Sequence, residues 1–206
     1  MKTLLVDIDG VLLDWVGGFT KWYEKNLHPN DVKIDFHHAN VKDDSYCLAE
    51  RYGIDKELIY YYINQFNRSG AFGSLESYDG LSGKLRNLSW GKGWQIYPVS
   101  SYLIDDGDSK SNMIQLRERN LNKDFPTFYH HVPLLLDSSK YNYLKAVKET
   151  LLPSDRLVFV DDKPANVWDG IDLGIETYML KQPWNKNHEL NKSHGKTWEE
   201  IYENLI

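Results

Sequence analysis

The sequence is poor in cysteine, in long apolar runs and in net positive charge. Cys47 is the only cysteine among 206 residues, so no disulfide can form within the chain and we expect a reducing, cytoplasmic compartment. No stretch approaches the roughly 20 apolar residues of a membrane helix, so we expect no membrane association. The net charge of −6 provides no overall basic surface for a nucleic-acid duplex, and we expect no stable nucleic-acid complex.

The composition is otherwise that of a folded protein with many aromatic residues. Hydrophobic residues make up 41% and charged residues 26% of the chain, and the length allows one core with room for a small insert. Aromatic residues make up 14%, including 14 Tyr and 7 Trp. Such a content indicates either a stacking surface or an aromatic-rich core, and composition alone does not distinguish the two.

Apolar runs and helical patterns alternate along most of the chain. The strand-like runs are 3–8, 94–99, 132–136 (with 127–129 as an extension), 157–161 and 175–180. Helical patterns occupy 80–88, 108–120, 139–151, 164–172 and 197–205. The runs are apolar throughout rather than alternating, which is typical of a parallel sheet covered by helices on both faces.

One segment does not fit this alternation. Residues 14–75 contain helical patterns and no convincing strand, and they are rich in Tyr and Trp. We therefore predict a helical cap at 14–75, inserted in a core formed by 1–13 and 76–206. The glycine- and serine-rich stretch 68–83 would be the hinge by which the chain returns to the core.

Two acidic pairs interrupt or end apolar runs. Asp7 and Asp9 lie within LLVDIDGVLL, where Gly10 permits a sharp turn, and Asp161 and Asp162 end LVFVDD. Parallel strands bind ligands at their carboxyl ends, so the two pairs should meet there. A cluster of carboxylates is unfavourable without a cation, and hard oxygen ligands favour Mg²⁺. Either pair alone could instead cap a helix or be solvated.

Further residues suit the binding of phosphate. Ser100 and Ser101 end the second apolar run, where hydroxyl and backbone N–H groups could bind phosphate oxygens. Lys140 begins a predicted helix, and its ammonium could neutralise phosphate charge. Strand-end serines and lysines are commonly solvated, so the order of these residues along the chain is the stronger signal.

That order, D-x-D-G-V-L, Ser-Ser, Lys and then apolar-D-D, resembles the haloacid dehalogenase superfamily from residue 4 to residue 180. The resemblance implies a three-layer α/β sandwich with a parallel Rossmann-like sheet and a cap after the first motif. FVDDKPANVWDG followed by KQPWNKN is similar to the 5′(3′)-deoxyribonucleotidase family. Three positions depart from that pattern: Tyr102 replaces a common proline, Lys163 replaces a common arginine, and Lys140 lies unusually far before Asp161. Lys110 is therefore an alternative to Lys140.

The resemblance implies a reaction and roles for the motif residues. Asp7 would attack phosphorus to form an aspartyl-phosphate, and Asp9 would protonate the leaving alcohol and later deprotonate water. Mg²⁺ would be held by Asp7, the backbone carbonyl of Asp9, Asp161 and Asp162. Phosphate would be bound by two hydroxyls and an ammonium, those of Ser100, Ser101 and Lys140. The substrate would be a small molecule. It would be a nucleoside monophosphate, in particular a deoxyribonucleoside monophosphate.

Specificity should depend on the predicted cap. The candidates to stack on a base are Phe19, Trp22, Tyr23 and Phe72. Phe19, Trp22 and Tyr23 are also spaced i, i+3, i+4, which is typical of the buried face of a helix. Trp184 could line the same pocket or only pack its loop.

Two other functions fit the same residues. The chain could hydrolyse another phosphate ester, such as a sugar phosphate or a nucleic-acid 3′-phosphate, or it could be a non-catalytic binding protein with this fold. Base and sugar preference stay open, and so does oligomeric state, for which a homodimer is one option.

Overall fold

The computed structural model describes residues 1–26, 45–101, 107–126, 134–135 and 139–206. The side chains of 107–111 and 134–135 lie outside this description. The side chain of Lys110, the alternative to Lys140, is among those outside this description. Tyr102, and the predicted strand 132–136 apart from the backbone of 134–135, also lie outside the described residues.

A five-stranded parallel sheet forms the centre of the molecule. Its strand order is β2-β1-β5-β6-β7, with every neighbouring pair parallel. The strands are β2 (Trp94–Pro98), β1 (Lys2–Val6), β5 (Arg156–Asp161), β6 (Glu176–Leu180) and β7 (Gly195–Lys196). Four of these match predicted runs, whereas β7 was not predicted. Two short strands, β3 (Ser100–Ser101) and β4 (Leu134–Leu135), pair separately.

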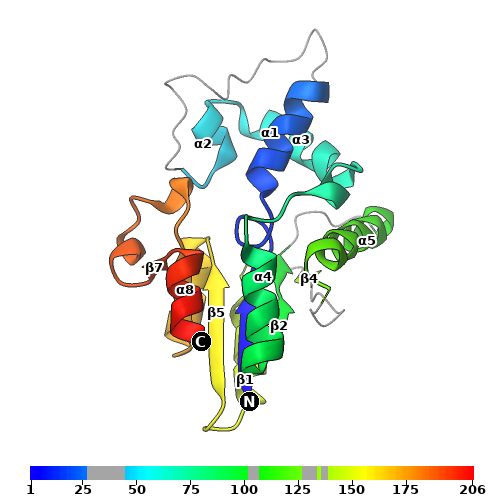
Figure 1. Cartoon of the computed structure of the whole chain (residues 1–206). Helices are drawn as coiled ribbons and strands as arrows, with labels where there is room; N and C mark the ends of the chain where they lie inside the picture. Colours follow the sequence, from blue (N-terminus) through cyan, green and yellow to red (C-terminus); the bar gives the residue numbers. More distant parts are fainter. Residues whose placement is uncertain (27–44, 102–106, 127–133, 136–138) are drawn as a thin grey trace.

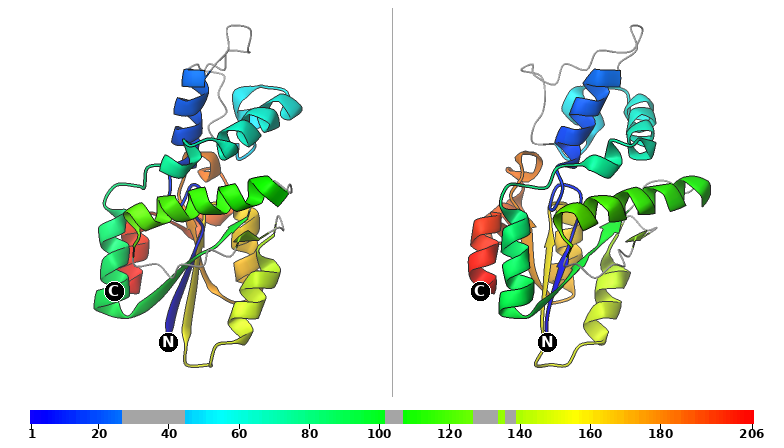
Figure 2. Two further views of the ribbon diagram at one scale, coloured as in Figure 1. Left: turned by 90° about the vertical axis from the view of Figure 1, so that its right-hand side faces the viewer. Right: turned by 45° about the vertical axis from the view of Figure 1, so that its right-hand side comes forward.

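Helices cover both faces of this sheet. Figures 1 and 2 show α4 and α8 on one face, and Figure 2 shows α6 and α7 on the other. Their bounds are α4 (Leu81–Arg86), followed by the π-helical turn η2 (Asn87–Gly91), α6 (Tyr141–Glu149), α7 (Pro164–Asp172) and α8 (Trp198–Leu205). The predicted three-layer α/β sandwich is confirmed. Strands such as β1 are apolar because both of their faces are buried.

A second group of helices lies beyond the carboxyl ends of the strands (Figure 1). It contains α1 (Trp15–Asn26), α2 (Leu48–Tyr52), α3 (Lys56–Arg68) and the 3₁₀ turn η1 (Phe72–Ser74). Helix α5 (Gly107–Asp124) runs between these helices and the sheet (Figure 2). Apolar side chains of α1 and α3 join those of β1 in one continuous buried cluster. The division into a core of 1–13 and 76–206 and a cap of 14–75 stays a prediction.

Aromatic side chains fill the interior of this helical group. The rings of Trp15 and Phe19 stack with centroids 5.2 Å apart, and Phe66 packs edge-on against both. Tyr23 meets Tyr62 edge-on at 4.8 Å. Much of the high aromatic content is therefore core. Within the part of the chain that is described, no helix combines the length and apolar character that crossing a bilayer requires.

Two helical glycines provide a matched test of the packing between α7 and the sheet. A Cβ on buried Gly170 would lie 2.5 Å from Thr177 Oγ1 and 3.1 Å from Phe159 Cδ1, whereas a Cβ on exposed Gly83 in α4 would meet no atom within 4 Å. We expect Gly170→Ala to lower the free energy of unfolding by about 1–3 kcal/mol through overpacking. Gly83→Ala should raise it by up to about 1 kcal/mol through helix propensity.

Urea denaturation of the two variants beside the wild type measures both changes. Equal stability of Gly170→Ala and Gly83→Ala would show that α7 does not pack on β5 and β6 as closely as described.

Candidate active site

Three carboxylates meet where β1 and β5 end. Asp7 follows β1 directly, Asp161 is the last residue of β5, and Asp162 comes next. The two strands are paired, and the Asp7 N–H donates to the Val160 carbonyl at 2.9 Å. One oxygen from each of the three acids lies within 4.8 Å of the others, and all three residues are buried. The two distant acidic segments are therefore brought together as the sequence predicts.

Lys140 lies among these acids. The residue is 1% exposed, and its Nζ donates to Asp7 Oδ1 and, at 2.7 Å, to Asp161 Oδ2. Burial disfavours the ammonium, but the attraction of Asp161 and Asp7 outweighs it and raises the pKa of Lys140 above its usual value. Lys140 is therefore a fixed positive charge shared by two carboxylates.

One ammonium does not balance three carboxylates. Burial raises the pKa of Asp7 to about 7; Lys140 opposes this shift, and repulsion from Asp161 and Asp9 adds to it. Burial, followed by repulsion from Asp161 and Asp7, raises the pKa of Asp162 well above its usual value. Asp162 Oδ1 is buried without a hydrogen-bond partner among the described residues. An excess of buried negative charge on hard oxygen ligands fits a divalent cation such as Mg²⁺.

Asp161 is oriented by its own neighbours. The Lys163 N–H donates to Asp161 Oδ1 at 2.8 Å, and Asn166 Nδ2 donates to Asp161 Oδ2 at 3.0 Å. Both donors come from the segment where α7 begins. Asp161 thus keeps both oxygens fixed at the edge of the sheet.

Asp9 does not join the three-carboxylate group. Its carboxylate instead forms an ion pair with Arg117 of α5, whose Nη2 donates to Asp9 Oδ2 at 2.6 Å. The chain turns at Gly10, where φ is +79° and a Cβ would lie 2.6 Å from Asp162 Oδ2. Only glycine allows both this turn and this approach to Asp162. The predicted metal contact of Asp9 uses its backbone carbonyl and stays a prediction.

The Q-P-W-N segment holds Asp162 and the turn at Gly10. Trp184 Nε1 donates to Asp162 Oδ2 at 2.6 Å, and Asn185 Nδ2 donates to the Asp162 carbonyl at 2.8 Å. Gln182 Nε2 donates to the Gly10 carbonyl at 2.6 Å. Trp184 also lines the pocket, so it both packs the loop and shapes the cavity.

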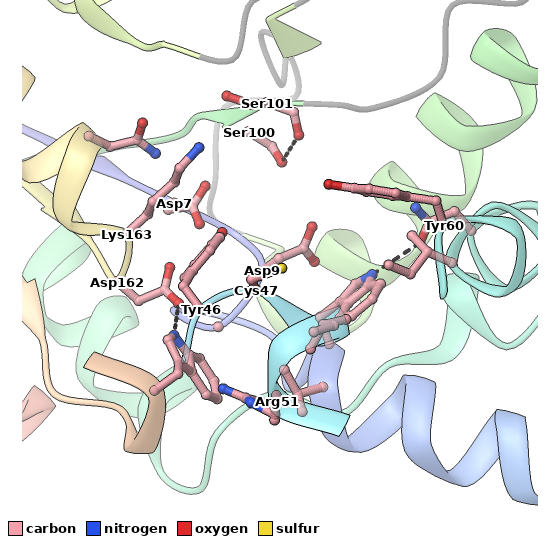
Figure 3. Close-up of a pocket in the computed structure, with 18 of the residues that line it drawn as sticks. Asp7, Asp9, Tyr46, Cys47, Arg51, Tyr60, Ser100, Ser101, Asp162 and Lys163 are labelled. Carbon is pink, nitrogen blue, oxygen red and sulfur yellow. Dashed lines mark hydrogen bonds between the residues drawn. The ribbon is translucent and has the colours of Figure 1, made fainter. Parts of the chain in front are cut away.

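A cavity of about 600 Å³ opens beside the acids (Figure 3). The residues that line it from the strand ends and the segments after them are Asp7, Asp9, Ser100, Ser101, Lys140, Asp162 and Lys163. Apolar and aromatic side chains line it from the helical group and α5: Trp15, Val16, Ile59, Tyr60, Ile63, Phe72 and Met113. The cavity therefore joins a charged floor to a mainly apolar wall.

The predicted phosphate-binding hydroxyls lie at this floor. Ser100 is 2% exposed, and its Oγ donates to the Ser101 carbonyl at 3.2 Å. Ser101 Oγ is buried and has no partner within the described part of the structure. Both serines line the cavity.

Three of the four predicted stacking residues, Phe19, Trp22 and Tyr23, do not line the cavity. Phe19 is fully buried among Trp15, Trp22 and Phe66, so it cannot stack on a ligand, and Trp22 is not a lining residue. Phe19 lies instead on a buried helix face, which was the alternative interpretation of this spacing. Phe72 does line the cavity.

Several lining residues were not predicted. Trp15 and Tyr60 supply aromatic surface where Phe19 and Trp22 were expected. Arg51 of α2 stacks its guanidinium on Trp184, 4.9 Å from the ring centroid. Burial of the Tyr46 hydroxyl, then repulsion from Asp162 and Asp7, raises its pKa, although half of the side chain is exposed. Trp15 lies only five residues after Gly10 of the first motif, and this closeness in sequence could have identified it as a lining residue.

Comparisons with known proteins identify the fold. No protein-family model matches the sequence, and no curated protein matches it. Among solved structures, a haloacid dehalogenase-like family hydrolase from Streptococcus pneumoniae is 14% identical, covers 99% of this chain and 98% of its own, and gives a TM-score of 0.59. A predicted phosphoglycolate phosphatase from Lactobacillus delbrueckii has the same identity and coverage, with a TM-score of 0.64.

A third structure, of the predicted hydrolase YfnB from Bacillus subtilis, is described as bound to magnesium. It is 16% identical, with coverage of 99% and 98% and a TM-score of 0.57. At these identities the likeness shows the fold, and the chain has the haloacid dehalogenase-like fold. The finer resemblance to 5′(3′)-deoxyribonucleotidases stays a prediction.

Asn185 provides a test of how the Q-P-W-N segment is held. Its buried side chain donates to the Asp162 and Leu180 carbonyls and accepts from the Gln182 N–H. Asn185→Ala leaves these groups without their partner, so we expect the free energy of unfolding to fall by about 3 kcal/mol. The exposed neighbour Lys186, changed to Ala, should cost less than about 0.5 kcal/mol. Chemical denaturation measures both, and equal midpoints for the two variants would contradict the described contacts.

Proposed function

We propose that this protein is a Mg²⁺-dependent phosphatase that hydrolyses nucleoside monophosphates through an aspartyl-phosphate intermediate. The observation that carries the proposal is the buried group of Asp7, Asp161 and Asp162 around Lys140, at the floor of a cavity of about 600 Å³. The haloacid dehalogenase-like fold supports a hydrolase. The deoxyribonucleoside preference is the finest part of the proposal and rests on the Q-P-W-N resemblance.

The reaction would take place in two displacements at phosphorus. A carboxylate oxygen of Asp7 attacks the phosphorus and forms an acyl-phosphate bond, while the bond from phosphorus to the ester oxygen breaks. Asp9 gives its proton to the leaving alcohol oxygen. Water then attacks the phosphorus of the intermediate, Asp9 takes a proton from that water, and phosphate leaves with Asp7 restored.

Fixed charges and donors support these steps. Lys140 holds Asp7 by one oxygen and adds positive charge beside the incoming phosphate. Ser100 and Ser101 would bind phosphate oxygens, and their place in the lining of the cavity supports this role. Mg²⁺, held by Asp7, Asp161, Asp162 and the backbone carbonyl of Asp9, would offset the repulsion between carboxylates and phosphate and stabilise charge on the transferring group.

The lining of the cavity supports a substrate with a flat apolar part. Trp15 and Tyr60 offer aromatic surface to the cavity, whereas Phe72, which also lines it, is 2% exposed and lies beneath the Arg117 guanidinium. A stacked base is worth about 1–3 kcal/mol in nucleic-acid binding proteins. The net charge of −6 disfavours a long polyanion and is compatible with a single nucleotide.

The first test concerns the nucleophile and the substrate class. Phosphate release is measured with Mg²⁺ on a panel of nucleoside 5′- and 3′-monophosphates and sugar phosphates. We expect the wild type to act fastest on a nucleoside monophosphate, and Asp7→Asn to reduce the rate by about 10³-fold or more because it removes the nucleophile. Asp172→Asn, at the exposed end of α7, is the matched control and should keep the wild-type rate.

Two results would contradict parts of this proposal separately. A folded Asp7→Asn protein with wild-type rates would exclude Asp7 as nucleophile and favour a non-catalytic role for the acids. Faster release from sugar phosphates than from any nucleotide would exclude the nucleoside assignment and keep the phosphatase.

The second test concerns the cation and uses no substrate. We expect Mg²⁺ to raise the midpoint of thermal unfolding because it binds the folded acids, with a shift that grows with Mg²⁺ concentration and is reversed by EDTA. Asp162→Asn should reduce this shift, whereas Asp172→Asn should keep it. An identical Mg²⁺ shift in the wild type and Asp162→Asn would exclude Asp162 as a ligand.

A further inference from the structure

Asp9, the proposed acid and base, is held by an ion pair with Arg117. Arg117 Nη2 donates to Asp9 Oδ2 at 2.6 Å, and both residues line the cavity. Figure 3 shows Asp9 near Asp7 in the same pocket. The ion pair joins the turn after β1 to the middle of α5, more than 100 residues later in the chain.

Arg117 is itself fixed in place. The residue is 4% exposed, and its guanidinium carbon lies 4.2 Å from the centroid of the Phe72 ring. Asn120, one turn further along α5, donates to the Phe72 carbonyl at 2.6 Å. Helix α5 and the turn η1 therefore hold the arginine on two sides, and Asp9 is attached to a rigid support.

The contact uses only one oxygen of Asp9. Asp9 Oδ1 is buried without a hydrogen-bond partner among the described residues, and so is Arg117 Nη1. An arginine has five donors in a fixed planar fork and no acceptor, so it orients a carboxylate by donating to it. The guanidinium therefore holds the Asp9 carboxyl group in place through one of its two oxygens.

We propose that Arg117 is the positioning residue of Asp9: its hydrogen bond to Oδ2 holds the Asp9 carboxyl group beside the ester oxygen of the substrate. This inference rests on the proposed function. Arg117 acts through Asp9, and its removal should impair the step in which Asp9 protonates the leaving group.

The leaving group of the substrate makes this role measurable. An alkyl phosphate, such as the best nucleoside monophosphate of the panel, needs a proton on its leaving oxygen, whereas p-nitrophenyl phosphate releases a stable anion. Removing a general acid typically costs about 10²–10⁴-fold. We therefore expect Asp9→Asn and Arg117→Met each to lower kcat about 10²-fold or more on the alkyl phosphate, and less than about 10-fold on p-nitrophenyl phosphate.

Three further variants complete the experiment. Arg117→Lys keeps the charge without the planar guanidinium and should restore part of the alkyl-phosphate rate. Arg119→Met is the matched control, since Arg119 is exposed two residues along the same helix, and it should keep both rates. The double variant Asp9→Asn/Arg117→Met should be no slower than Asp9→Asn, because Arg117 has nothing left to position.

Other results overturn the inference. Equal losses on both substrates would make Arg117 a structural residue, and a raised KM with unchanged kcat would make it a ligand of the substrate. Losses that multiply in the double variant would show that Arg117 acts independently of Asp9. If Arg117→Met does not fold, as judged by circular dichroism, Arg117→Lys decides by the same comparison of substrates.

Failure of the proposed function gives a different result. A folded wild type that releases no phosphate from either substrate removes the phosphatase proposal and this inference with it. A second outcome removes only the role of Arg117. In that outcome the wild type is active, Asp9→Asn shows the expected dependence on the leaving group, and Arg117→Met keeps the wild-type rates.

Discussion

The interaction of Lys140 with Asp7 and Asp161 is the constraint on which the rest of the site depends. Three carboxylates can be buried together only where positive charge offsets their repulsion, and Lys140 is the cation that bonds two of them. The parallel pairing of β1 with β5 sets the distance between the acids. The negative charge that Lys140 leaves unbalanced is the reason why a divalent cation fits this site.

Each of the other carboxylates has a separate support. Asp162 is held by Trp184 and by the Asn185 amide, and Asp9 is held by Arg117. These supports come from opposite parts of the chain, the C-terminal loop and the middle of α5. The cluster of three acids can therefore bind a cation while Asp9, on its own support, takes part in proton transfer in the proposed reaction.

Local sequence patterns predict what depends on neighbouring residues and fail where distant contacts decide. The apolar runs predicted β1 and β5 within two residues, and parallel pairing then required Asp7 and Asp161 to be close. The two-residue strand β7 is too short to produce a pattern. Phe19 could not be assigned, because buried and ligand-stacking faces of a helix have the same spacing. Arg117 gave no signal, since only the fold brings it to Asp9.

The central position of β1 has a consequence for how the protein is made. Strand β1 lies between β2 and β5, whose residues are synthesised some ninety and more than a hundred and fifty positions after those of β1. Lys140 is 133 residues from Asp7 in sequence, so such long-range contacts can close only late in synthesis. A nascent chain that stops before β5 contains Asp7 and Lys140 but lacks Asp161 and Asp162, so the group of three carboxylates cannot form.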